Sequence, residues 1–220
     1  MKFDIPAQLG LVTRQVRARE HQGQAAHVVA ASRDYDTSIA DLWDALTNAE
    51  RIPRWFLPIS GELRVGGRYQ LQGNAGGTIE TCTPPHQLAL TWEFGGEISW
   101  LELRLSEHGE GTRLELEHLV PVNEHWQKFG PGAVGVGWDL TLQGLGRHLA
   151  SGEAVDPAQA LAWMGSAEGK AFLAHSSDDW CRAAIASGTP ASVAQAAAAR
   201  TTAAYAGAPS DESGTAPGGA

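Results

Sequence analysis

Short stretches of alternating apolar and polar residues, separated by turn-forming residues, constrain the fold of this chain more than any other feature. Side chains of a strand point alternately to opposite faces, so a period of two is typical of strands with one buried face. Eight stretches are bounded as strands are: 12–19, 25–34, 62–65, 68–72, 78–83, 87–94, 98–106 and 112–120. Their connections are short and rich in Gly and Pro, which favours antiparallel hairpins over crossovers. We therefore expect seven or eight antiparallel strands.

Alternation also assigns faces to these strands. Leu90, Trp92 and Phe94 share one side of their strand, and Leu103 and His118 lie on the matching sides of theirs. The other face carries charged residues, which indicates solvent: Glu102, Arg104, Arg113, Glu115 and Glu117. The sheet is thus expected to bury one face only.

Helical periodicity appears beside the strands. Capping boxes at 38–41 and 47–50 predict two short helices, the second ending at the adjacent aromatics Trp55 and Phe56. A long helix is expected at 131–151, where one apolar stripe runs through Val134, Trp138, Leu142, Leu145 and Leu149. That stripe must be buried, and the apolar face of the sheet is the available partner. The expected fold class is α+β, and residues 1–152 are expected to form one domain.

The chain after Gly152 changes to Ala, Ser and Gly and predicts three helices at 157–163, 166–187 and 190–205. Neither of the two longer helices has enough apolar residues to be an independent domain. We expect residues 153–206 to dock on the main body with Trp180 as anchor, either over a cavity mouth or on the long helix through Leu140. A loosely attached helical tail is the alternative. Residues 207–220 have little to bury and are expected to be disordered.

Charge and cysteine content narrow the function classes. The formal charge of −9 argues against nucleic-acid binding, since phosphates require a basic surface. The sequence has no run of about 18 apolar residues that could span a membrane, and its first residues lack the apolar core of a signal peptide. The two isolated cysteines, Cys82 and Cys181, are typical of a reduced compartment, so a cytoplasmic location is expected. The sequence does not indicate an oligomeric state.

Two motifs suggest a cofactor or a metal, and both have a simpler interpretation. The residues GPGAVG at 130–135 match G-x-G-x-x-G, but no buried strand precedes them, and tight helix packing explains the glycines as well. His118 and His125 lie near two glutamates, but alternation separates His118 from them and places His125 in a loop. No nucleophile with a neighbouring base stands out. We therefore expect neither cofactor nor metal.

Several segments in order resemble the START-like (SRPBCC, pollen-allergen-like) superfamily, in particular bacterial proteins similar to the C-terminal domain of the activator of heat-shock-protein-90 ATPase. They are TSIADLWDALTNAERIPRWFLP, GELRVGGRYQL, GGTIETCTPPHQLALTWEF, GTRLELEH and GVGWDLTLQGLGRHL, which span roughly residues 12–151. The resemblance implies a helix-grip fold, in which a bent antiparallel sheet surrounds a long C-terminal helix. It also implies two short helices that close one end of an apolar cavity, with Trp55 and Phe56 at its rim.

The resemblance leaves three functions open: binding of a small apolar or amphipathic molecule in that cavity, a cyclase- or hydrolase-like reaction in the same place, or a chaperone- or client-binding module. The residues expected to line the cavity are Trp55, Phe56, Tyr69, Leu90, Trp92, Phe94, Leu103, His118, Trp138 and Leu142. Each aromatic residue could instead be packed core, and His118 could be a core histidine, a polar anchor or an acid–base group. Ligand binding is our leading hypothesis, and enzymatic activity is left undecided.

Overall fold

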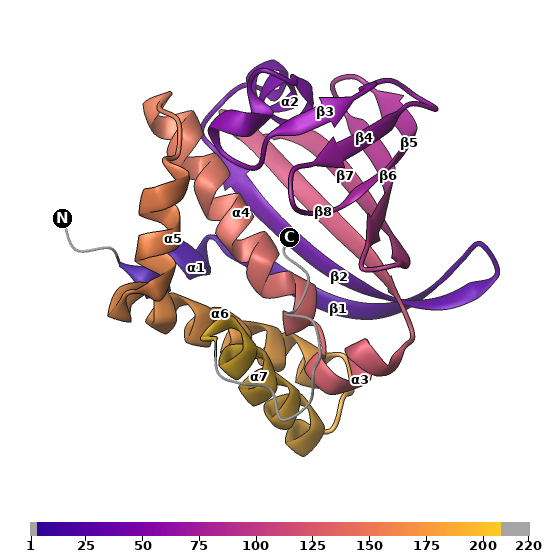
Figure 1. Cartoon of the computed structure of the whole chain (residues 1–220), viewed down its shortest axis with the longest axis vertical. Coiled ribbons are helices and arrows are strands. Elements are labelled where there is room, and N and C mark those ends of the chain that lie inside the picture. The colour runs from indigo at the N-terminus through magenta and orange to yellow at the C-terminus, as the bar shows by residue number, and fades with distance from the viewer. Residues whose placement is uncertain (1–3, 208–220) are drawn as a thin grey trace.

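Eight antiparallel strands form a single curved sheet in the computed structural model of the protein, which describes residues 4–207. Their order across the sheet is β1-β2-β8-β7-β6-β5-β4-β3. The strands are β1 (Val12–His21), β2 (Gln24–Tyr35), β3 (Ile59–Gly61), β4 (Arg68–Leu71), β5 (Gly76–Thr83), β6 (Gln87–Phe94), β7 (Glu97–His108) and β8 (Gly111–Pro121). Figure 1 shows the sheet bent around one long helix, so the expected α+β helix-grip fold is confirmed.

The register of the central strands confirms the expected faces. Leu103 lies opposite Leu116 and Leu101 opposite His118, and all four side chains are buried on the concave side. The convex side carries ion pairs between strands, such as that of Arg19 in β1 with Glu102 in β7. Glu102 is itself buried, so this face is less open to solvent than the alternation alone indicates.

The stretch 62–65 is not a strand, which corrects one prediction. The third strand is Ile59–Gly61 instead, and it pairs with β4. Gly61 adopts a φ of 108°, which L-residues rarely adopt, and it ends the strand there. The following residues form a loop that is tied to β5 by hydrogen bonds between Gly66 or Gly67 and Ile79.

Two short helical segments follow β2. The helix α2 (Ile39–Thr47) begins as predicted, because the Ser38 hydroxyl accepts a hydrogen bond from the Asp41 backbone N–H. The second predicted capping box, at Thr47 and Glu50, is wrong. The Thr47 hydroxyl donates to the Trp43 carbonyl, and Asn48 accepts from the Glu50 N–H in its place. A 3₁₀ turn, η1 (Ile52–Arg54), then leads into Trp55 and Phe56.

The long helix α4 (Gly132–Ser151) packs in the concave face, and its residues Trp138, Leu142 and Leu145 belong to the main core. Two short helices were not predicted, α1 (Ile5–Gly10) and α3 (Glu124–Phe129). Their side-chain caps, Asp4 and Asn123, were visible in the sequence, but six residues are too few to show a period of 3.6. His125 therefore lies in a helix and not in a loop.

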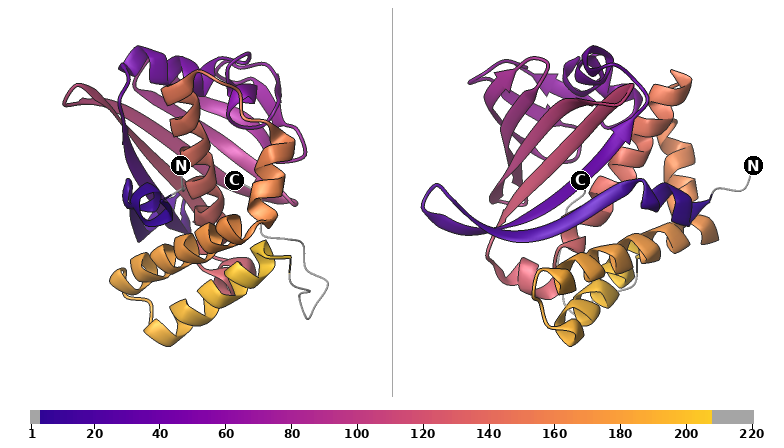
Figure 2. Two further views of the ribbon diagram at one scale, coloured as in Figure 1. Left: turned by 90° about the vertical axis from the view of Figure 1, so that its left-hand side faces the viewer. Right: turned by 180° about the vertical axis from the view of Figure 1, so that it is seen from behind.

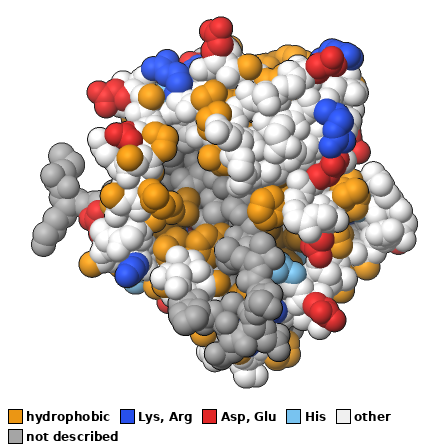
Figure 3. Space-filling view, in the orientation of Figure 1, with side chains coloured by type: hydrophobic (Ala, Val, Ile, Leu, Met, Phe, Trp, Pro, Cys, Tyr) orange, Lys and Arg blue, Asp and Glu red, His pale blue; other side chains and the backbone are white. Residues whose placement is uncertain are grey.

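Three helices follow α4: α5 (Pro157–Gly165), α6 (Ala167–Ala186) and α7 (Ala191–Tyr205). Figure 2 shows α6 and α7 side by side across the end of α4. Figure 3 shows hydrophobic side chains on the surface over α4 and α5. Leu161 of α5 is 68% exposed.

The contact between α6 and α4 is close. The fully buried Trp180 lies over Gly135, where a Cβ atom would come within 2.3 Å of the indole ring. Leu140 of α4 packs with Phe172 of α6, as expected, and also with Ile5 and Leu9 of α1. Trp180 is not among the residues around the cavity described below. The division at residue 152 stays a prediction, and residues 208–220 of the expected disordered tail lie outside the described part of the chain.

Candidate functional site

An apolar cavity lies between the concave face of the sheet and α4. The cavity has a volume of about 120 Å³, measured as the space open to the centre of a water-sized sphere. On the same measure a single water molecule requires roughly 10–15 Å³. The residues that line the cavity come from both short helical segments and the residues just after η1, from β3 to β8, from the loop between β3 and β4, and from α4. They are Leu46, Thr47, Ile52, Trp55, Phe56, Ile59, Leu63, Arg64, Tyr69, Leu71, Ile79, Cys82, Leu88, Leu90, Trp92, Leu101, Leu103, Leu114, Leu116, Trp138, Thr141, Leu142 and Leu145.

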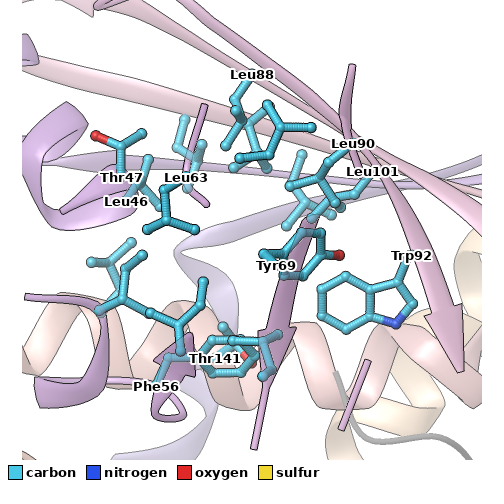
Figure 4. A pocket seen from close by; sticks show the side chains of 18 of the residues that line it. Leu46, Thr47, Phe56, Leu63, Tyr69, Leu88, Leu90, Trp92, Leu101 and Thr141 are labelled. Carbon is cyan, nitrogen blue, oxygen red and sulfur yellow. The ribbon is translucent and has the colours of Figure 1, made fainter. Parts of the chain in front are cut away.

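Figure 4 shows how the labelled side chains surround this space. Leu46, Thr47, Leu63 and Phe56 gather toward one end, and Trp92 lies toward the other. The residues at the first end are all partly exposed, whereas Trp92 is buried. The cavity therefore opens beside α2, η1 and the loop between β3 and β4.

Polar groups in the wall are largely committed to the protein itself. The Tyr69 hydroxyl donates to the Thr91 carbonyl at 2.8 Å, and the Trp55 indole donates to the Ala45 carbonyl at 2.9 Å. Thr141 donates to the carbonyl four residues earlier in α4 at 2.9 Å. Burial also raises the pKa of the Tyr69 hydroxyl, so this group stays neutral. A wall of this kind favours apolar ligand groups, because it offers few free donors.

The adjacent aromatics of η1 both contribute to the cavity. Trp55 and Phe56 stack with ring centroids 5.6 Å apart, and both line the cavity near its open end. The tight 3₁₀ turn at Ile52–Arg54 leads directly into the two aromatic residues, and both rings face the cavity.

Eight of the ten predicted residues line the cavity: Trp55, Phe56, Tyr69, Leu90, Trp92, Leu103, Trp138 and Leu142. Phe94 and His118 do not. Phe94 is a partly buried residue packed against the core, and His118 lies behind the wall formed by Trp92 and Trp138. Contact of any of these residues with a ligand stays a prediction.

His118 belongs to a chain of hydrogen bonds that begins at the Trp138 indole and ends at the Trp92 carbonyl. The Trp138 indole donates to Nδ1 at 3.0 Å, so the ring proton of the neutral imidazole is on Nε2. Nε2 then donates to the Ser99 hydroxyl at 2.8 Å, and that hydroxyl donates to the Trp92 carbonyl at 3.0 Å. Complete burial lowers the pKa of His118 to about 3. Both ring nitrogens are thus committed, and Ser99 is not activated as a nucleophile because His118 donates to it.

Several lining residues were missed from the sequence. Leu88, Leu101, Leu114 and Leu116 were placed on the apolar face, and the same alternation that selected Leu90 and Leu103 could have selected them. The loop residues Leu63 and Arg64 had no such signal, since their stretch was expected to be a strand.

Other kinds of site find little support within residues 4–207. No group of three or more His, Cys, Asp or Glu side chains is arranged to hold a metal ion there. In that same range, no helix is long and apolar enough to cross a membrane. The glycines at 130–135 face α6 and α7, since a Cβ on Gly132 would meet Thr201 and one on Gly135 would meet Trp180.

Comparison with solved structures finds the same architecture elsewhere. The crystal structure of CalU16 from Micromonospora echinospora shares 32% sequence identity, with a TM-score of 0.64, and the match covers 79% of this chain and 98% of that one. The solution structure of CalU16 shares 33% identity, with a TM-score of 0.69 and coverage of 80% and 96%. The protein MLL2253 from Mesorhizobium loti has the same fold at 21% identity and a TM-score of 0.51, with coverage of 56% and 96%.

No curated protein matches the chain. The model of one protein family does, and it matches residues 36–150, which contain α2, η1, β3 to β8, α3 and nearly all of α4. Every residue around the cavity lies within this matched stretch. The chain therefore belongs to the family of Activator of Hsp90 ATPase homolog 1-like proteins.

Proposed function

We propose that the protein binds a small, largely apolar molecule in the cavity between the sheet and α4. The observation that carries this proposal is the internal space itself, whose wall consists almost entirely of Leu, Ile and aromatic side chains. Ligand sites are typically apolar enclosures with a few polar groups, and empty space of this size in a core costs packing contacts. A cavity retained at that cost is better explained by binding than by packing.

The geometry around His118 supports binding over acid–base catalysis in the cavity. A general acid or base needs a free nitrogen within reach of the substrate. Both nitrogens of His118 are within 3.0 Å of protein partners, and the aromatic rings of Trp92 and Trp138 lie between this residue and the cavity. A chaperone or client protein would bind to an exposed surface instead. A core filled with side chains would have favoured that function. The open cavity favours a small ligand instead.

Both cysteines are free, which fits the expectation of a reduced compartment, and we keep a cytoplasmic location as part of the proposal. Cys82 lines the cavity and Cys181 lies in α6, so modification of the Cys82 thiol alone would report on access to the cavity.

Titration with the uncharged fluorophore N-phenyl-1-naphthylamine tests the proposal. We expect saturable binding at one site, with a blue-shifted emission because the dye enters an apolar space. Leu63→Trp places a larger side chain at the cavity opening and should weaken binding by about tenfold, equivalent to about 1.4 kcal/mol. Val65→Trp is the matched control, because Val65 is in the same loop but is 53% exposed and does not line the cavity.

Equal weakening by both substitutions would contradict binding in the cavity, as would a dye that does not bind the unsubstituted protein. Melting temperatures of both variants should stay near that of the original protein, since Leu63 is only partly buried and Val65 is exposed.

A further inference from the structure

The one charged residue among the described residues around the cavity is Arg64. Its side chain is 70% exposed although it contributes to the lining, so it marks the place where the cavity meets solvent. Leu63 and Phe56 at the same end are partly exposed apolar residues. The cavity thus combines an apolar interior with a positive charge at its opening.

The interior would not accept a charged or strongly polar ligand group. The hydroxyl and indole donors of Tyr69, Trp55, Trp138 and Thr141 already have partners in the protein. Desolvating an ionic group without such partners is strongly unfavourable. Any charged part of a ligand must therefore remain at the opening, within reach of Arg64.

Arg64 can change partners readily. It pairs with Glu62, whose side chain is 65% exposed, and an ion pair between two exposed side chains contributes little to stability. A guanidinium also presents several N–H donors in a fork that matches the geometry of a carboxylate. An anionic ligand group could share this fork with Glu62 or displace it.

We propose that the ligand is an amphipathic anion, with an apolar chain or ring system in the cavity and an anionic end group held by Arg64. This proposal rests on the proposed function, because it requires the apolar part to enter the cavity. It adds a ligand class and a residue that determines specificity. Glu62 acts as the competing anion in the free protein.

Displacement of N-phenyl-1-naphthylamine by three ligands of equal chain length tests the proposal: decanoic acid, decanol and decylamine, at pH 8 and low salt. Decanoate should bind about three- to tenfold more tightly than decanol, and decylamine more weakly than both, as expected for one partly exposed charge-assisted contact. Arg64→Gln should remove the preference for decanoate and leave decanol binding unchanged. Glu62→Gln should strengthen decanoate binding, because it frees Arg64.

Arg68→Gln is the matched control. Arg68 is 65% exposed and pairs with Glu93 much as Arg64 pairs with Glu62, but it does not line the cavity, so its loss should change none of the three affinities. Equal binding of the three ligands, or a preference for decanoate that survives Arg64→Gln, would overturn the proposed ligand class. Failure of decanol to bind at all would overturn the proposed function as well.

Discussion

A buried ion pair between the sheet edge and α4 provides the most demanding test of how the C-terminal helices are held. The Asp139 carboxylate on α4 is fully buried and accepts hydrogen bonds from Arg14 Nε at 3.0 and 3.1 Å. It also accepts hydrogen bonds from Ser176 and Trp180 of α6, the latter at 3.1 Å. Burial raises the pKa of Asp139, and the Arg14 guanidinium opposes that rise. One carboxylate therefore joins β1, α4 and α6.

Replacing Asp139 by Ala should destabilise the protein strongly. Arg14 is only 7% exposed, so the substitution leaves a buried guanidinium without its main counter-charge. Removing one partner of a buried pair typically costs about 3–5 kcal/mol. Asp179 lies 3.2 Å from Arg14 and compensates in part, which places the expected loss near the lower end of that range. The melting temperature should fall by roughly 10 °C.

Urea unfolding followed by circular dichroism measures this loss, with Asp179→Ala as the control. Asp179 is 18% exposed and pairs with Arg14 Nη1, which also donates to the Leu9 and Val12 carbonyls, so its loss should cost less than that of Asp139. Combining Arg14→Met with Asp139→Leu removes both charges and should recover part of the stability. Equal effects of Asp139→Ala and Asp179→Ala would refute the idea that Asp139 joins these elements.

Three further predictions concern the core and the C-terminal helices. His118 stays neutral to about pH 3 in the folded protein, while the unfolded chain binds the proton near pH 6.5. The contribution of His118 to the free energy of unfolding is therefore complete above pH 6.5 and falls by up to about 1.4 kcal/mol per pH unit below it. Urea unfolding at pH 7 and pH 5 should show that the free energy of unfolding depends less on pH in His118→Gln than in the original protein. An equal pH dependence in the two proteins would contradict this. Gly135→Ala should lower the melting temperature because its Cβ would lie 2.3 Å from the Trp180 ring, whereas Gly165→Ala, with open space around it, should not. Removing residues 153–220 should cause aggregation because it exposes the core beneath Trp180; a soluble protein with an unchanged melting temperature would show that these helices are only a tail.

The fold could be predicted from the sequence largely because its long strands alternate cleanly. Leu101, Leu103 and Leu105 face the core in one unbroken register, and most turns between strands contain glycines. The third strand was misplaced because Ile59–Gly61 is too short to show alternation, while the loop after it contains Leu63 and Val65 two residues apart. Short helices with good caps were missed for the same reason.

The candidate site was predictable in part. Aromatic and leucine residues on the concave face were correctly placed, but alternation reports only which face a side chain takes. Phe94 and His118 share that face but lie outside the cavity lining. Phe94 is the last residue of β6, and His118 lies behind Trp92 and Trp138. Arg64 lies in a loop, and only the folded chain brings it to the opening.

The role of Asp139 was also hidden in the sequence. It lies opposite the apolar stripe of α4, a position that normally faces solvent in an amphipathic helix. Its partners Arg14 and Trp180 are 125 and 41 residues away in the chain. No local pattern connects three such distant residues.

Leucine methyl NMR of the isotope-labelled protein, titrated with decanol, tests the central claim most directly. If the cavity binds apolar molecules, the methyl signals of Leu88 and Leu90 in its wall should shift in a saturable manner. Leu9 and Leu173 are buried outside the cavity, and their signals should stay unchanged. Unshifted signals of Leu88 and Leu90 at saturating decanol, or shifts confined to exposed residues such as Leu161, would contradict the account.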